Sequence, residues 1–361
     1  MRPASPVASD TAPRGGVVFS GLPSVPGAAG DDWPRPPGWQ RNGHWQTIGA
    51  ALWARRGVAA PLDWLRERWT TPDGDFIDVD HIVPPGAVAM LVLFHGLEGS
   101  SASHYAQAFA AEAQRRGWAI AVPHFRGCSG EPNRAPRAYH SGDFEEIAWM
   151  LARVAQRWPD WPRVAVGVSL GGNALLRWLQ EAGAGAAAAV RAAAAISAPL
   201  DLAAAGAAID RGLNRVLYAR MFLRTMRRKA REKWARFPGL FDLERALGAR
   251  TLRAFDDAFT APLHGFRGVE DYWRRASSRR HLRAVRVPTL VLNARNDPFV
   301  PGASLPDATE AGPYVQLWQP ARGGHVGFAE PCSPWDMRGD VAPLQQWVMP
   351  WLAEAAGWPG R

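Results

Sequence analysis

The sequence predicts an α/β protein with one central, mostly parallel β-sheet, an antiparallel hairpin on its amino-terminal side, helices on both faces and a helical cap insert. Three observations lead to this fold class. Apolar runs of strand length alternate with amphipathic helical stretches, as in parallel sheets covered by helices. An Asp-Gly pair between two strand-like runs indicates a hairpin. The alternation stops between about residues 201 and 282, where helical patterns replace it.

Composition narrows the classes of protein that fit. The 361 residues are 47% hydrophobic, which is enough for a large buried core. The net charge of +9 comes almost wholly from arginine, since lysine occurs only at positions 229 and 233. We interpret this excess as compositional bias and expect no nucleic-acid partner. Cys128 and Cys332 form neither a disulfide framework nor a metal-binding spacing, so we expect a reducing compartment.

The amino-terminal residues 1–35 are rich in proline, glycine and alanine and lack the compact apolar core of a signal peptide. We interpret them as a flexible tail that precedes a single domain over residues 36–361. No stretch reaches the roughly 18 to 20 uninterrupted apolar residues that span a bilayer. We therefore expect a cytoplasmic protein.

The first elements after this tail are a helix cap and a hairpin. Residues 41–48 are polar and aromatic and are expected to cap a helix. Strands over 65–69 and 76–83 flank the turn at Asp73-Gly74. Acidic residues recur here at positions 73, 75, 78 and 80, but the glutamate that completes a calcium loop is missing. Their alternation with apolar residues favours a strand, so we expect no metal.

The next elements build the sheet and its helical layers. The continuous apolar run at 88–94 predicts a buried parallel strand. Further strands are predicted at 118–123, 164–166, 192–197, 288–294 and 314–318, and helices at 105–116, 145–158, from 173 onward and at 341–352. Because parallel strands end at one edge of a sheet, residues just after them are expected to lie close together.

The stretch Gly167-Val168-Ser169-Leu170-Gly171 joins a β-branched strand to an apolar-periodic helix. In a G-x-S-x-G turn the serine occupies a strained bend and exposes its hydroxyl at the carboxyl end of the strand. The flanking glycines let strand and helix pack closely. An ordinary glycine-rich turn has the same composition, so a nucleophilic role for Ser169 depends on partners.

Those partners are a general base and a carboxylate that orients it. In sheets with this turn they follow the serine in the order acid, then histidine, each after a later strand. Asp297 follows the strand at 288–294, and His325 follows the strand at 314–318. Asp201 is the rival acid, and His95 is expected to shape its own loop. Ser169, Asp297 and His325 are therefore the predicted catalytic residues.

Acyl transfer also requires hydrogen-bond donors for the tetrahedral oxyanion. The backbone N–H of Leu170 follows the nucleophile at the start of the helix. The second donor is expected in the loop after the strand at 88–94, where the N–H of Leu97 is best placed.

The insert at about 201–282 contains a basic amphipathic helix. Its apolar residues (Leu213, Val216, Leu217, Met221 and Phe222) interleave with arginines. We favour a cap helix whose apolar side covers the active site and whose basic side faces water. The alternative is peripheral contact with an anionic membrane surface through this helix.

With these partners identified, the chain resembles the YheT-like branch of the α/β-hydrolase superfamily. The matching segments are Asn42–Thr47, His95–Gly99, Phe125–Asn133, Tyr139–Asp143, Gly167–Asn173, Phe255–Asp257, Asp271–Trp273, Asn296–Phe299 and Gly324–Phe328. The resemblance implies the α/β-hydrolase fold, the same three catalytic residues, and substrates from short-chain acyl esters to monoacylglycerol-like lipids. The long proline-rich tail departs from the pattern of the family.

The leading functional hypothesis is therefore a serine hydrolase that cleaves small-molecule carboxylic esters in lipid metabolism through an acyl-enzyme, without a cofactor or metal. A second hypothesis is acyl transfer from acyl-CoA to an alcohol, or thioester cleavage, because the same three residues serve these reactions. A third is a non-catalytic protein that binds lipid or a membrane surface through the basic insert.

Overall fold

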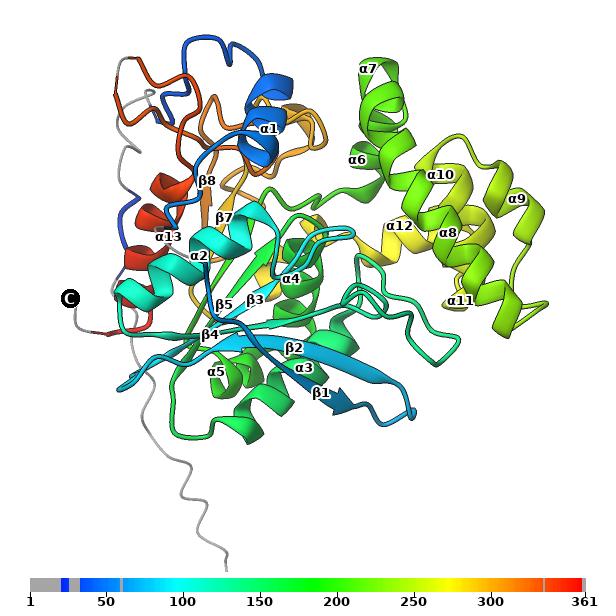
Figure 1. Ribbon diagram of the computed structural model, residues 1–361, viewed down its shortest axis with the longest axis horizontal. Coiled ribbons are helices and arrows are strands. Elements are labelled where there is room, and N and C mark those ends of the chain that lie inside the picture. The colour runs from blue at the N-terminus through cyan, green and yellow to red at the C-terminus, as the bar shows by residue number, and fades with distance from the viewer. Residues whose placement is uncertain (1–20, 26–32, 59–60, 334, 359–361) are drawn as a thin grey trace, which may run out of the picture.

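The computed structural model describes residues 21–25, 33–58, 61–333 and 335–358. Eight strands form one sheet in the order β1-β2-β4-β3-β5-β6-β7-β8 (Figure 1). The strands are β1 Leu65–Thr70, β2 Phe76–Ile82, β3 Met90–Phe94, β4 Ala119–Pro123, β5 Arg163–Val168, β6 Ala192–Ile196, β7 Thr289–Leu292 and β8 Val315–Trp318. Strands β3 to β8 run parallel, whereas β2 pairs antiparallel with both β1 and β4. The predicted fold class is confirmed.

Helices cover both faces of the sheet because its parallel strands are apolar on both sides. The helices are α2 His104–Arg115 and α13 Ala342–Ala355 on one face, and α3 Phe144–Arg157, α4 Leu170–Ala182 and the short η1 Gly183–Gly185 and α5 Ala186–Ala189 on the other side. Alternate residues of β3 divide between the two cores. Leu91 packs in the cluster that contains Phe109 of α2, whereas Val92 packs in the cluster that contains Ile147 of α3.

The acidic residues of the hairpin pair with arginines rather than forming a metal cage. Asp78 lies opposite Arg68 and Asp80 lies opposite Arg66 in the β1–β2 register, and each pair forms an ion pair at 2.6 to 2.7 Å. Among the described residues, no cluster of three or more His, Cys, Asp or Glu side chains has a geometry suited to a metal ion.

The chain between β6 and β7 leaves the sheet and forms a helical lobe beside its carboxyl edge (Figure 1). It contains α6 Leu202–Ile209, α7 Gly212–Asn214, the π-helix η2 Arg215–Ala219, α8 Arg220–Arg236, α9 Leu243–Gly248, α10 Leu252–Phe255, the π-helix η3 Asp256–Thr260, α11 Ala261–Leu263, α12 Val269–Ala276 and η4 Arg279–Ala284. The lobe has a core of its own, which includes Leu223, Phe241, Phe255 and Phe259. The short η5 Gly302–Ser304 follows β7.

The expected orientation of the basic helix is wrong for most of its apolar residues. Leu213, Val216, Leu217 and Met221 are between 46% and 67% exposed and face solvent. Phe222 alone of the five lines the cavity described below. The buried stripe of α8 is instead formed by Leu223, Ala230 and Lys233. The exposed apolar residues thus lie mostly on α7 and η2, ahead of α8, and the buried face of α8 includes a lysine.

The predicted flexible tail falls mostly on residues 1–20 and 26–32, which lie outside the described part of the chain. Two described pieces of it make contacts. Val25 is 7% exposed, and the Pro23 carbonyl accepts a hydrogen bond from Trp351 Nε1 at 3.2 Å. Trp33 stacks on Trp318 with 4.5 Å between ring centroids. For the rest, the tail stays a prediction, as does the division into one domain and a cap.

Candidate active site

Ser169 lies at the sharp bend between β5 and α4, with φ 53° and ψ −119°. A non-glycine residue in this region of backbone space costs roughly 1 to 3 kcal/mol, so the surrounding structure must hold it there. Its N–H donates to the Ile196 carbonyl of the neighbouring strand at 2.8 Å. The side chain accepts no capping hydrogen bond from α4, so its hydroxyl is available for another partner.

The glycines around Ser169 are required by close packing. A Cβ on Gly167 would lie 2.5 Å from the Gly171 carbonyl oxygen, and a Cβ on Gly171 would lie 2.5 Å from the carbonyl oxygens of Phe94 and His95. Real Cβ atoms do not approach that closely. The bend is therefore pressed against the loop that follows β3.

The structure brings Ser169, His325 and Asp297 into one hydrogen-bonded line. His325 Nε2 lies 2.9 Å from Ser169 Oγ, and His325 Nδ1 lies 2.8 Å from Asp297 Oδ2. The carboxylate can only accept, so Nδ1 carries the proton and Nε2 is free to accept from the serine hydroxyl. A base within this distance of a hydroxyl, and itself oriented by an acid, is the arrangement that nucleophilic catalysis by serine needs.

Asp297 is held by its own loop. Its Oδ1 accepts hydrogen bonds from the N–H groups of Phe299 at 2.7 Å and Val300 at 3.2 Å, and its side chain has no exposed surface. The Phe299 ring packs on the His325 ring with 4.4 Å between centroids. These contacts fix the carboxylate and the imidazole against each other.

The rival acid and the other candidate histidine have structural roles. Asp201 is the N-cap of α6, where its Oδ1 accepts from the N–H of Ala204 at 3.0 Å. His95 is fully buried, and this burial lowers its pKa to about 3. It donates from Nδ1 to the Gly96 carbonyl at 2.8 Å and accepts at Nε2 from the Phe125 N–H at 3.0 Å.

The two predicted oxyanion donors line the same cavity as Ser169 and His325. Residues 96–99 form a turn closed by the Gly99 N–H and the Gly96 carbonyl at 3.0 Å. A Cβ on Gly96 would touch Ser169 Cβ at 3.2 Å, which places this turn beside the serine. Within the described ranges, the N–H groups of Leu97 and Leu170 have no hydrogen-bond acceptor. Their role as donors stays a prediction, as do the catalytic roles of the three side chains.

Sequence analysis missed the part that helix α1, Gly43–Leu52, plays in the site. It correctly expected a cap, since Asn42 accepts from the Trp45 N–H at 3.1 Å. The helix also joins the acid loop to the histidine loop. Gln46 Oε1 accepts from Asn296 Nδ2 at 2.9 Å and from the Gly323 N–H at 2.8 Å, and Thr47 Oγ1 accepts from the His325 N–H at 2.8 Å. Only the family resemblance of residues 42–47 pointed to this segment.

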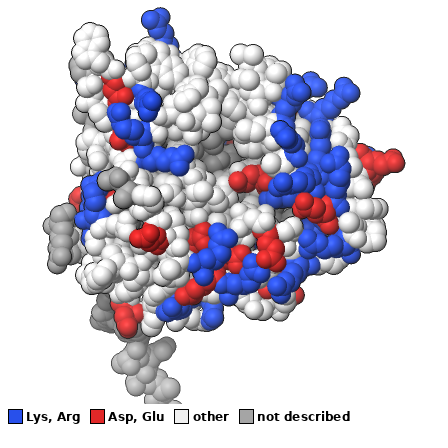
Figure 2. All heavy atoms as spheres, in the orientation of Figure 1, with Lys and Arg blue, Asp and Glu red and all other residues white. Residues whose placement is uncertain are grey.

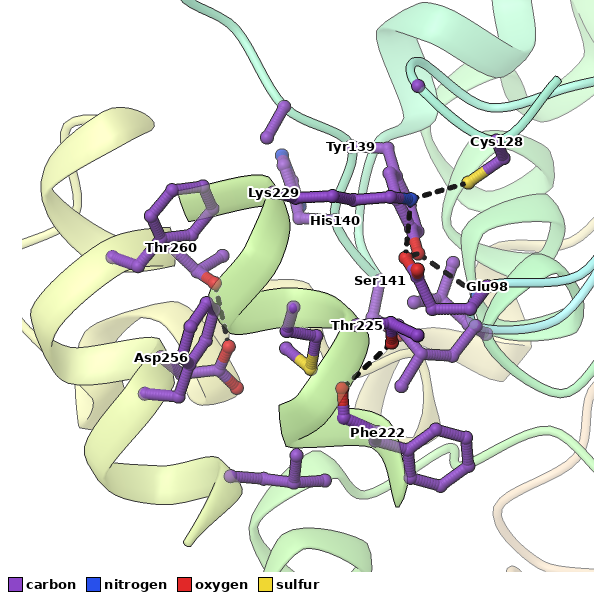
Figure 3. Close-up of a pocket in the computed structure, with 18 of the residues that line it drawn as sticks. Glu98, Cys128, Tyr139, His140, Ser141, Phe222, Thr225, Lys229, Asp256 and Thr260 are labelled. Atoms are coloured by element: carbon purple, nitrogen blue, oxygen red, sulfur yellow. Dashed lines mark hydrogen bonds and ion pairs between the residues drawn. The ribbon is translucent and has the colours of Figure 1, made fainter. Parts of the chain in front are cut away.

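A cavity of about 550 Å³ lies between the sheet edge and the insert and reaches Ser169 and His325. Figure 3 shows part of its wall, where α8 faces the loops of the sheet. Its apolar lining includes Leu202, Ile209, Phe222, Met226, Leu252, Phe255, Phe259, Trp273 and Phe299. Asp256 also lines it, and burial raises the pKa of this carboxyl to about 6. The cavity therefore combines an apolar chamber with the serine at one wall.

No helix in the described part of the chain is both long enough and apolar enough to cross a membrane.

Comparison with known proteins places these features in a family. Residues 89–331 match the α/β hydrolase fold family. The chain is 40% identical over 292 residues to an Escherichia coli (strain K12) protein named "Putative esterase YheT", covering 80% of this chain and 84% of that protein. It is 30% identical over 283 residues to phospholipase ABHD3 of Mus musculus, covering 76% of this chain and 68% of that protein.

Solved structures agree in fold. The structure of DcsB in complex with its substrate analogue superimposes with a TM-score of 0.52 at 13% sequence identity, over 82% of this chain and all of that one. This chain therefore belongs to the α/β-hydrolase family, in the branch of the esterase-like YheT protein, and is a carboxylic ester hydrolase.

Proposed function

We propose that the protein hydrolyses acyl esters through an acyl-enzyme formed on Ser169. His325 Nε2 takes the hydroxyl proton as the serine oxygen attacks the ester carbonyl, and it then returns the proton to the leaving alcohol. Asp297 keeps the imidazole in the required tautomer and stabilises its positive charge. Water, deprotonated by the same histidine, then releases the acid. The observation that supports this most directly is the line of hydrogen bonds from Ser169 through His325 to Asp297.

The negative charge of the tetrahedral intermediate would be stabilised by the N–H groups of Leu97 and Leu170. Both line the cavity beside the serine, and both lack a partner among the described residues. One such donor is typically worth about 3 kcal/mol of transition-state stabilisation.

We further propose that the substrates are acyl esters from short-chain esters to monoacylglycerol-like lipids. The apolar lining of the cavity offers the acyl chain a desolvated site. The relative named as a phospholipase supports a lipid ester. A panel of p-nitrophenyl and monoacylglycerol esters of graded chain length would locate the preferred acyl group.

Replacement of the nucleophile tests the proposal. Ser169→Ala is expected to lower turnover of a p-nitrophenyl ester by roughly 10⁶-fold and to abolish labelling by a fluorophosphonate. Ser141→Ala is the matched control, because Ser141 lines the same cavity but hydrogen-bonds Asn173 rather than the histidine. Undiminished labelling of the Ser169→Ala variant would exclude Ser169 as the nucleophile.

Acyl transfer is the competing reaction, since the acyl-enzyme can be resolved by an alcohol as well as by water. An acyl-CoA supplied together with ethanol separates the two. Hydrolysis is expected to dominate. Faster formation of the ethyl ester than of the free acid would assign the enzyme to acyl transfer instead.

We also propose that the exposed stripe of the insert contacts anionic lipid surfaces. Leu213, Val216, Leu217 and Met221 are exposed there, and arginines flank them. Figure 2 shows basic side chains gathered over the α7–α8 side of the molecule. A helix with both features suits the interface of an anionic membrane. Leu217→Glu combined with Met221→Glu should weaken co-sedimentation with phosphatidylglycerol vesicles; unchanged binding would contradict the proposal.

A further inference from the structure

The only two lysines of the chain, Lys229 and Lys233, lie one turn apart on α8, whereas all other basic residues are arginines. Arginine presents a flat fork of donors, whereas the lysine ammonium is a compact charge with three donors in a tetrahedral arrangement. Both lysines point from the insert toward loops at the sheet edge. The contacts of the two ammonium groups show which loop each lysine holds.

Lys233 uses all three donors on one loop. Its Nζ lies 2.8 Å from Asn133 Oδ1, 2.8 Å from the Ala135 carbonyl and 3.1 Å from the Arg137 carbonyl. The residue is 8% exposed, and burial lowers its pKa to about 8. Lys233 therefore docks α8 on the loop that follows β4.

Lys229 reaches a different loop. Its Nζ lies 2.7 Å from Glu98 Oε1 and 3.4 Å from Cys128 Sγ (Figure 3). Burial alone would lower the pKa of Lys229, but the neighbouring Cys128 and Glu98 raise it above its usual value. The ammonium is thus charged at neutral pH and forms a mostly buried ion pair with Glu98, whose side chain is 16% exposed.

Glu98 belongs to the turn that presents the N–H of Leu97. It has φ 56°, in the third position of the turn closed by Gly96 and Gly99, where glycine is usually preferred. Tyr139 holds it twice: the Glu98 N–H donates to Tyr139 Oη at 3.1 Å, and Tyr139 Oη donates to Glu98 Oε1 at 2.7 Å. The strained turn is therefore fixed through the side chain of Glu98.

We infer that Lys229 is a positioning residue, which holds the oxyanion turn in its active shape through Glu98 and so makes oxyanion stabilisation depend on the docked insert. The inference rests on the proposed function, because it assigns Lys229 a part in presenting the Leu97 N–H. The ion pair stabilises an unfavourable backbone conformation by anchoring the carboxylate of the residue that adopts it. When α8 lifts, Glu98 keeps only the tyrosine hydroxyl, and the turn is free to relax.

The test compares two lysine variants of the same helix. Lys229→Met should lower kcat for a p-nitrophenyl ester by roughly 10- to 100-fold, because a shifted donor loses transition-state stabilisation. KM should stay within about twofold, since the ground-state ester makes little use of the donors. Lys233→Met leaves the Lys229–Glu98 ion pair in place, so α8 stays held at the oxyanion turn. This variant should therefore destabilise the protein but change kcat by no more than about threefold. Concentrations of active enzyme come from fluorophosphonate titration.

A double-mutant cycle decides whether Lys229 acts through Glu98. In a Glu98→Gln background, Lys229→Met should cost less than about threefold in kcat, because the partner charge is already gone. The affinity for an alkyl boronic acid, which mimics the tetrahedral intermediate, should fall in proportion to kcat. If Lys229→Met fails to fold, Glu98→Gln alone should show the same loss of kcat and of boronate affinity.

Several results would overturn the inference. Equal kcat for the Lys229→Met and Lys233→Met variants would do so, as would additive effects in the cycle or an unchanged kcat for Glu98→Gln. Failure of the proposed function is a separate result: wild-type enzyme would then show no turnover that depends on Ser169.

Discussion

The sheet edge and the helical insert hold their functional groups in different ways. At the edge, Ser169, Asp297 and His325 each follow a strand, and backbone hydrogen bonds of the parallel sheet fix where the strands end. The insert consists of the 17-residue helix α8, several shorter helices and two π-helical segments, which pack around their own core. Polar side-chain contacts of α8 dock it on the loops of the edge. The proposed catalytic groups therefore lie on the part whose geometry is set by the backbone, whereas the insert that lines the cavity is attached through side chains.

The largest expected effect tests the edge. Asp297→Asn should lower kcat by roughly 10⁴-fold, because the amide no longer enforces the productive tautomer of His325. Steady-state kinetics on a p-nitrophenyl ester measures the loss. Asp201→Asn is the control, because its carboxylate caps α6 and should leave the rate near that of wild type. A large loss from the control and none from Asp297→Asn would mean that the acid is Asp201.

A smaller effect tests the hydrogen bonds by which Gln46 joins the loop of Asp297 to the loop of His325. Gln46→Ala leaves the Asn296 amide and the Gly323 N–H without their acceptor, which should cost about 1 to 3 kcal/mol in the free energy of unfolding. The acid and histidine loops should then shift, lowering kcat by roughly 10- to 100-fold. Leu52→Ala, at an exposed position of the same helix, should change neither quantity. Denaturant titration and kinetics would show both, and a stability loss without a kinetic one would assign α1 to folding alone.

The smallest effect concerns the insert, where the partly buried Asp256 accepts hydrogen bonds from Thr260 and Trp273. Burial raises its pKa to about 6, so the protonated form is favoured in the folded state. Below the pKa of an aspartate in the unfolded chain, protonated Asp256 makes its full contribution to stability. That contribution is lost as the pH rises through about 6, the pKa in the folded protein. Asp256→Asn should therefore stabilise the protein by up to about 3 kcal/mol above that pH and hardly at all near pH 4.

Denaturant titrations of both proteins at several pH values measure this difference. A difference that stays constant with pH would mean that folding leaves the pKa of Asp256 unchanged.

The same difference between the sheet edge and the insert explains which features could be predicted from the sequence. Strand positions and the candidate residues at the edge follow from apolar runs, glycine spacing and chain order, because a parallel sheet converts order in sequence into position in space. The buried face of α8 was not predicted, because it includes Lys233, whereas the more hydrophobic Leu217 and Met221 at and before its start are exposed. The contacts of Gln46 were not predicted either. They join residues that are separated by 277 and 250 positions in the sequence, and no local pattern indicates such a contact.

The arginine-rich composition has a practical consequence through α8. Amine-reactive reagents find only two lysine side chains in the chain, both engaged in docking the insert and one of them 8% exposed. Their contacts with the loops of the sheet edge compete with modification of the amines. The extent of amine modification at positions 229 and 233, measured by mass spectrometry with and without an ester analogue, would thus test whether the insert lifts from the sheet, with no engineered probe.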